Sequence, residues 1–305
     1  MQQPGLLSLW FNRRGWSDIV IAAPYVWLVI FFLVPFLIVV GMSFATRTPT
    51  APPFGYGGEN PLLNLEGYAR LFTDDLYIRA FLTSILNAAV AMTLCLLIGY
   101  PMALGLTRVD RSWRNILLML VILPFWTSFL LRVYAWMGLM GKNSWFNALL
   151  IDAWNLLVPL DWAIKSIPMM HSNFAVVLVM AYTYLPFMIL PLDANLERLD
   201  PTLDEAAMDL GSRPFRMFWD VTLPQSLPGI IAGGMLVFIP AAGELVIPTF
   251  VGDAGSPMIG RVISDEFSQA NDWPMASSVA VSLLLLMGVP MMVYSHYQAR
   301  AEGAK

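Results

Sequence analysis

The chain has 305 residues, of which 58% are hydrophobic and only 12% charged, and its mean hydropathy is +0.65. Soluble domains carry about 25% charged residues, so this composition excludes an ordinary soluble protein. The single cysteine, Cys95, lies in an apolar run and excludes an intrachain disulfide. The formal net charge of −4 is uninformative by itself, because the distribution of charge across a membrane matters more than its sum.

Taken in order, the chain contains six apolar segments of the length needed to cross a bilayer, which is about 20 residues. These predicted spans are 19–44, 81–106, 116–140, 173–194, 229–247 and 275–296. Pro124 interrupts the third span, and Trp145–Val158 reads as a shorter helix at the membrane interface. The sequence therefore predicts an all-α polytopic membrane protein with six transmembrane helices, an N-terminal segment at 1–18 and a tail at 297–305.

The positive charges predict the orientation of these spans. With both termini cytoplasmic, the inner segments hold ten basic residues: Arg13, Arg14, Arg108, Arg111, Arg114, Arg198, Arg213, Arg216, Arg300 and Lys305. The outer segments hold six, namely Arg47, Arg70, Arg79, Lys142, Lys165 and Arg261. The outer segments are also longer in total, so their density of positive charge is lower still. We therefore expect both termini and the 195–226 loop on the cytoplasmic side.

That loop contains a helix–glycine–helix pattern. Asp200-Pro201 or Thr202 caps a helix, and Thr202 with Glu205 has the spacing of a capping box. The residues Glu205 to Leu210 read as helix and Gly211 as its stop, followed by a second short helix, Phe215–Val221, that Leu223-Pro224 ends. Helices this short are marginal in water, so they need another surface to cover them. One alternative is an amphipathic loop resting on lipid headgroups.

The loop resembles the "EAA" loop of binding-protein-dependent ABC importer permeases. The resemblance lies in Glu205-Ala206-Ala207, in a glycine four residues after the second alanine, and in Leu-Pro about a dozen residues further on. In that family the loop forms coupling helices that sit in a groove of the cytoplasmic ATPase. The resemblance implies a type I (MetI-like) permease fold, and it implies ATPase-coupling roles for these residues: Glu205, Ala206, Ala207, Asp209, Leu210, Gly211 and Arg213.

Other stretches are similar to the polyamine permease subunits of PotB/PotH type, closest to the putrescine branch. They include 99–103, 123–136, 235–244, 258–262 and 272–274. The resemblance implies a multi-pass protein of the bacterial inner membrane that works with a second permease subunit, two ATPase subunits and a periplasmic polyamine-binding protein. It implies no cofactor and no nucleic-acid partner.

Glu244 is the strongest candidate for contact with substrate. A carboxylate inside a span is costly unless it faces protein or water, and the flanking Pro240, Gly243 and Pro248 indicate a broken helix. A cationic diamine needs carboxylates, and aromatic faces cover its charged ends. Alternatively, Glu244 pairs with Arg132 and holds two spans together. The further substrate-path candidates are Asp193, Asp265, Glu266, Trp126, Tyr134, Tyr182 and Tyr184, although Asp193 sits where snorkelling to water is easy.

The outer loops add ten acidic residues, which predict an anionic mouth: Glu59, Glu66, Asp74, Asp75, Asp152, Asp161, Asp253, Asp265, Glu266 and Asp272. No Walker A loop, GxSxG or HExxH motif appears, and the two histidines lack metal-ligand spacing. We therefore expect no catalytic residues and no metal, with ATP hydrolysed by a separate subunit. The alternative function is an ion-coupled secondary transporter of small cations, although no internal repeat supports it.

Overall fold

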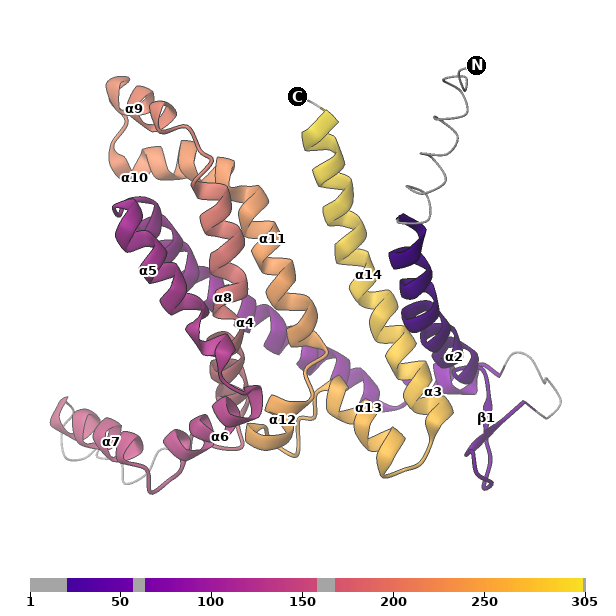
Figure 1. Ribbon diagram of the computed structural model, residues 1–305. Coiled ribbons are helices and arrows are strands. Elements are labelled where there is room, and N and C mark those ends of the chain that lie inside the picture. Colours follow the sequence, from indigo (N-terminus) through magenta and orange to yellow (C-terminus); the bar gives the residue numbers. More distant parts are fainter. Residues whose placement is uncertain (1–20, 57–63, 158–167, 304–305) are drawn as a thin grey trace, which may run out of the picture. The chain divides into compact units, whose positions relative to one another are not determined.

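The computed structural model describes residues 21–56, 64–157 and 168–303 (Figure 1). It divides into two compact units, one of residues 1–70 and 266–281 and one of residues 71–265 and 282–305. The expected N-terminal segment at 1–18 lies outside the described residues, as do Glu59, Asp161 and Lys165.

The first unit begins with an apolar helix, Ile21–Met42, which contains a π-helical turn η1 (Val29–Leu33) followed by α2 (Val34–Met42). Two short antiparallel strands follow, β1 (Thr46–Arg47) and β2 (Phe54–Gly55), and then α3 (Glu66–Thr73) begins. The unit also holds the start of α14 (Trp273–Gly303). The outer segment between the first two predicted spans therefore contains two short strands and a helix.

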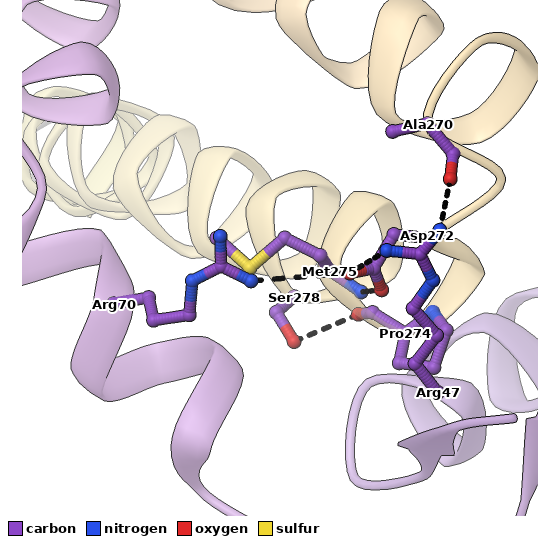
Figure 2. Close-up of polar contacts among 7 residues, drawn as sticks. All are labelled: Arg47, Arg70, Ala270, Asp272, Pro274, Met275 and Ser278. Carbon is purple, nitrogen blue, oxygen red and sulfur yellow. Dashed lines mark hydrogen bonds and ion pairs between the residues drawn. The ribbon is translucent and has the colours of Figure 1, made fainter.

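A polar cluster organises this unit (Figure 2). Asp272 caps α14 by accepting a hydrogen bond from the Met275 amide at 3.0 Å. Arg47 and Arg70 both approach the same oxygen of Asp272, each at 3.9 Å, and Arg47 also donates to the Ala270 carbonyl at 2.6 Å. Asp272 is buried, so it does not contribute to an anionic mouth, contrary to the sequence prediction.

The second unit is built on three helices, α4 (Asp75–Thr107), α8 (Asn173–Leu196) and α11 (Leu223–Ala242), which pack together (Figure 1). Small residues permit the close packing, as expected for helices that lack a hydrophobic drive to associate within lipid. A Cβ on Gly233 of α11 would lie 3.0 Å from the backbone oxygen of Met188 on α8. The buried side chains of this core include Ala88, Ala91, Cys95, Val179, Met180, Ile189, Val237 and Ala241.

The third predicted span is broken, as Pro124 indicates, and its halves are strongly bent. The segment consists of α5 (Arg111–Ile122), a 3₁₀ turn η2 (Leu123–Trp126) and α6 (Phe129–Met140), with an angle of 91° between Arg111–Trp126 and Phe129–Met140. The helix that follows, α7 (Trp145–Leu157), matches the expected short helix.

The prediction that Leu223-Pro224 ends a helix is wrong. Pro214–Ala242 is continuous helix, formed by α10 (Pro214–Met217), a π-helical turn η4 (Phe218–Thr222) and α11. The widened π turn precedes Pro224 and so accommodates a residue that lacks an amide proton and would crowd the preceding turn. The helix ends at Ala242, before α12 (Val246–Val251) and α13 (Ile259–Ser268), so it does not reach Ile247 as predicted.

Four described helices are long and apolar enough to cross a membrane, or five if the bent pair is one span: Ile21–Met42, Asp75–Thr107, Asn173–Leu196 and Pro214–Ala242, plus the pair. The apolar part of α14, Trp273–Val289, falls just below that length. The all-α polytopic architecture is confirmed, whereas the count of six spans stays a prediction.

Candidate functional site

The first helix of the helix–glycine–helix segment and its glycine stop form as predicted, whereas the second helix continues into α11. In α9 (Pro201–Asp209) the side chain of Asp200 accepts hydrogen bonds from the Thr202 amide at 3.0 Å and hydroxyl at 2.8 Å. Asp200 is therefore the cap, which settles the alternative left open by the sequence. The Thr202 amide, and secondarily its hydroxyl, lower the pKa of Asp200. Gly211 has φ of +87°, the left-handed conformation that glycine adopts without strain at a helix end.

The segment presents an exposed apolar surface. The exposed fraction is 90% for Leu210, 76% for Phe215 and 53% for Trp219. Of the seven predicted coupling residues, only Ala207 is half-buried; Glu205, Ala206, Asp209, Leu210, Gly211 and Arg213 are exposed. Such a surface on a well-formed segment is typical of a protein-interaction site.

Glu244 lies where the sequence predicts a broken helix. It follows the end of α11, and its carboxylate accepts hydrogen bonds from the amides of Val246 at 3.0 Å and Ile247 at 3.5 Å, at the start of α12. The hydroxyl of Tyr184 on α8 donates to the same carboxylate. Glu244 is buried, with 8% of its surface exposed, so its carboxyl oxygens are satisfied by hydrogen bonds within the protein rather than by water.

An aromatic row runs from this carboxylate toward Arg132. The rings of Tyr184 and Phe187 have centroids 6.1 Å apart, and Phe187 meets Phe125 edge-on at 5.0 Å. The guanidinium of Arg132 lies over the rings of Phe125 and Phe129, at 5.6 and 5.7 Å from their centroids. Arg132 and Glu244 form no ion pair within the part of the chain that the structure describes, so the structure does not show the pairing that the sequence offered as an alternative.

Sequence reasoning missed Phe187, although its spacing of three residues from Tyr184 places both on one helix face. Phe125 was noted only as part of a longer motif. Their proximity depends on the packing of α8 against the bend after α5, which no local pattern specifies.

Other predicted path residues have different surroundings. Trp126 is 73% exposed, Tyr134 packs against Phe250 with centroids 5.3 Å apart, and Tyr182 packs against Trp136 at 5.4 Å. Asp265 forms an ion pair with Arg261 at 3.7 Å, and Glu266 follows it in α13. The structure gives none of these residues a hydrogen bond to Glu244.

Asp193 is buried and bonded to Arg114 of α5 at 2.8 Å, so it does not snorkel to water as expected. Arg114 had been counted only as a positive charge. Its pairing makes Asp193 a contact between helices rather than a free carboxylate for substrate.

The chain combines packed spanning helices, a broken segment and an exposed helix–glycine–helix surface, an arrangement that suits a membrane permease driven by a separate subunit. Residues 95–302 match the family of binding-protein-dependent transport system inner membrane components, and the chain belongs to that family. It is thus an inner-membrane permease component of the ABC importer class, and not an enzyme.

Two relatives with known names show which kind of permease the chain is similar to. The chain is 38% identical over 285 residues to the spermidine/putrescine transport system permease protein PotB of Haemophilus influenzae, covering 92% of this chain and 94% of that protein. The PotB of Escherichia coli is 35% identical over 268 residues, covering 88% and 92%.

Solved structures share the fold at low sequence identity. A bacterial ABC transporter that imports the acidic polysaccharide alginate matches with a TM-score of 0.69 and 16% identity, covering 96% of this chain and 99% of that chain. The inward-facing methionine transporter MetNI matches with a TM-score of 0.53 and 17% identity, covering 73% and 94%. These matches confirm the type I, MetI-like permease fold.

Proposed function

We propose that the chain is a permease subunit of an ATP-driven polyamine importer. The single observation that carries this proposal is its identity of 34–38% to several PotB proteins over about nine-tenths of its length, since those relatives are named as spermidine/putrescine permeases. Putrescine is the proposed substrate, and spermidine is the competing one.

The geometry supports a cation path. Glu244 is a buried carboxylate held by Tyr184 and two amides, and the rings of Tyr184, Phe187 and Phe125 continue from it. An ammonium group bound there exchanges its water for a carboxylate and for aromatic faces, which are the groups that attract an organic cation. In the proposed cycle the substrate ammonium takes the place of the Tyr184 hydroxyl at Glu244.

The exposed α9–α10 surface supports an interaction with a soluble ATPase. We propose that Leu210, Phe215 and Trp219 become covered in the assembled importer, which also contains a second permease subunit, two ATPase subunits and a periplasmic polyamine-binding protein. The proposed topology has six spans, with α5–α6 as the third and α14 as the sixth, and both termini are cytoplasmic.

Uptake measurements test the function. Cells that lack their own polyamine uptake are given this chain together with its neighbouring transport genes, and uptake of labelled putrescine and spermidine is measured. We expect uptake that requires the ATPase gene and that survives collapse of ion gradients while ATP is maintained. Uptake that persists without the ATPase gene and stops with the ion gradient would identify an ion-coupled secondary transporter instead.

Labelling tests the topology. Cys95 is fully buried, so it adds little background to labelling with a membrane-impermeant thiol reagent. Ser212→Cys in the α9–α10 turn is expected to react only after the membrane is opened. Thr50→Cys in the 45–56 segment is the matched control and is expected to react in intact cells. Labelling of Ser212→Cys in intact cells would place the α9–α10 surface outside and end the proposal that it docks on an ATPase.

A further inference from the structure

Arg114, in the first turn of α5, binds two carboxylates at the end of α8. Its Nη2 atom lies 2.8 Å from Oδ2 of Asp193. Its two terminal nitrogens also meet both oxygens of Glu197, Nη1 to Oε1 at 2.5 Å and Nη2 to Oε2 at 2.9 Å. One guanidinium thus joins two helices through three short contacts.

Burial separates this link from the ordinary ion pairs of the chain. The side chains of Arg114 and Asp193 are 13% and 7% exposed, whereas those of Arg216 in α10 and Asp220 in η4, which also form a pair, are 80% and 61% exposed. Exposed pairs contribute little, because water competes for both groups. Loss of one partner from a buried pair leaves a charge without compensation, so the two helices are firmly connected here.

The link sits directly beside the α9–α10 segment. Glu197 is the residue that ends α8, and Asp200, three residues further on, caps α9. The hydrogen bonds from Arg114 are the main cause of a lowered pKa at Glu197, which is consistent with a persistent contact. A second polar contact, from the Thr222 hydroxyl to Asp204 at 3.2 Å, connects α9 to the start of the following long helix.

A cavity of 340 Å³ lies between these connections, with Arg114, Glu197, Asp200, Asp204 and Thr222 among its lining residues. The polar contacts therefore bridge a gap in the packing. Where side chains do not interlock, directional charged contacts are what make one helix follow another.

At its other end, α5 leads into the aromatic row. The 3₁₀ turn after α5 contains Phe125, whose ring meets Phe187 of α8 and supports the guanidinium of Arg132. A displacement of α5 along its axis thus reaches the row that extends to Glu244.

We infer that Arg114 is a positioning residue that makes α5 move with the α9–α10 segment and so conveys ATPase movement to the aromatic row. This inference rests on the proposed function. It assigns to Arg114 neither contact with substrate nor contact with ATP.

The test separates ATP hydrolysis from uptake. The complete importer is purified and reconstituted in vesicles, and uptake per ATP hydrolysed is measured for wild type, Arg114→Gln, Glu197→Gln and Arg111→Gln. Arg111 is an exposed arginine in the same turn that lies near Glu197 but forms no ion pair in the described structure, so it is the control for loss of a positive charge without loss of the link. The side chain of Glu197 is 60% exposed, so Glu197→Gln is not expected to prevent folding.

We expect Arg114→Gln to lower uptake per ATP about tenfold or more and Glu197→Gln to lower it several-fold, while hydrolysis continues and Arg111→Gln matches wild type. The double variant Arg114→Glu with Asp193→Arg restores the link, because an arginine at 193 reaches both position 114 and Glu197, and it is expected to recover uptake per ATP.

The inference would be overturned if uptake per ATP hydrolysed were unchanged in both Arg114→Gln and Glu197→Gln, even if both rates fell together. If Arg114→Gln prevents assembly, Glu197→Gln and the double variant decide the matter alone. A wild-type complex without ATP-dependent uptake would instead contradict the proposed function, so the two failures are distinguishable.

Discussion

Replacing Gly260 with alanine is expected to disturb the Glu244 site through the backbone of Gly243 and Glu244. Gly260 lies near the start of α13, and a Cβ at that position would be 2.5 Å from the backbone oxygen of Gly243 and 2.6 Å from that of Glu244. Ordinary van der Waals contact begins at 3.4 Å, so these neighbours must retreat by 0.8 to 0.9 Å. Both are backbone atoms at the helix break, and they cannot rotate away as the end of a side chain does.

The expected cost follows from overpacking, which typically destabilises by about 1–3 kcal/mol. Since about 1.4 kcal/mol is a factor of ten in an equilibrium, a cost of roughly 2 kcal/mol reduces the population of the native break about 30-fold relative to a relaxed alternative. The carboxylate of Glu244 then no longer meets Tyr184 and the amides of Val246 and Ile247 in one geometry. We expect a lower thermal midpoint of the purified complex and weaker uptake.

Gly105→Ala is the matched control for this substitution. Gly105 lies inside α4, and a Cβ there meets nothing within 4 Å. Alanine is favoured over glycine in a helix interior by roughly 0.5–1 kcal/mol, so this variant is expected to be at least as stable as wild type. Equal midpoints and equal uptake for Gly260→Ala and Gly105→Ala would refute the steric argument.

Four further predictions concern other sites. Glu244→Gln is expected to reduce polyamine uptake at least tenfold with normal assembly, while Tyr184→Phe, which keeps the carboxylate, changes substrate affinity less; loss of the assembled complex in Glu244→Gln would indicate a structural role. Gly211→Val forces a β-branched residue into φ of +87°, which is expected to destabilise the α9–α10 turn by about 1–2 kcal/mol and to weaken binding of the ATPase. Asparagine tolerates that conformation, so Gly211→Asn is expected to retain the ATPase in a pull-down assay. Asp272→Asn is expected to lower the thermal midpoint, because Arg47 and Arg70 lose their shared charge, and limited proteolysis of the 45–56 segment reports it. The lowered pKa of Asp200 means that its cap stabilises α9 above the ordinary pKa of 3.8 and is lost as pH falls through the lower folded value, so an Asp200→Ala variant loses that pH dependence in amide exchange of α9.

Local patterns in the sequence predicted the elements that local chemistry controls. The acidic cap before α9, the glycine that ends it and the proline break after α5 each depend on a few neighbouring residues, and all three occur in the structure. The resemblance of the 199–224 stretch to the EAA loop correctly predicted the family. Pro224 shows the limit of such rules, because a π turn placed before it lets the helix continue where a stop was predicted.

Contacts between residues far apart in the sequence could not be predicted from local patterns. Glu244 and Tyr184 were both candidates, but their hydrogen bond spans 60 positions and depends on how α8 meets the end of α11. One of the two roles considered for Glu244 was a pair with Arg132, since opposite charges within a membrane are expected to pair. In the structure, the faces of Phe125 and Phe129 rather than a carboxylate lie against the half-buried Arg132, and composition cannot distinguish these two surroundings for a cation.

The placement of polar contacts suggests which parts of the second unit move together. Helices α4, α8 and α11 interlock through small and apolar side chains, with Gly233 against Met188, and interlocked surfaces of this kind resist sliding. Helix α5, by contrast, is connected to α8 at one end by Arg114 and at the other by the edge-on contact of Phe125 with Phe187. Between these two contacts, Leu117, Leu118 and Val121 of α5 pack against the core, and a 91° bend follows Phe125. Since Phe125 lies at that bend, a small rotation of α5 changes its position against Phe187 before it disturbs the three-helix core. If the α9–α10 segment docks on an ATPase as proposed, movement imposed there is expected to change the lining of the proposed cation path without unpacking the helices that support it.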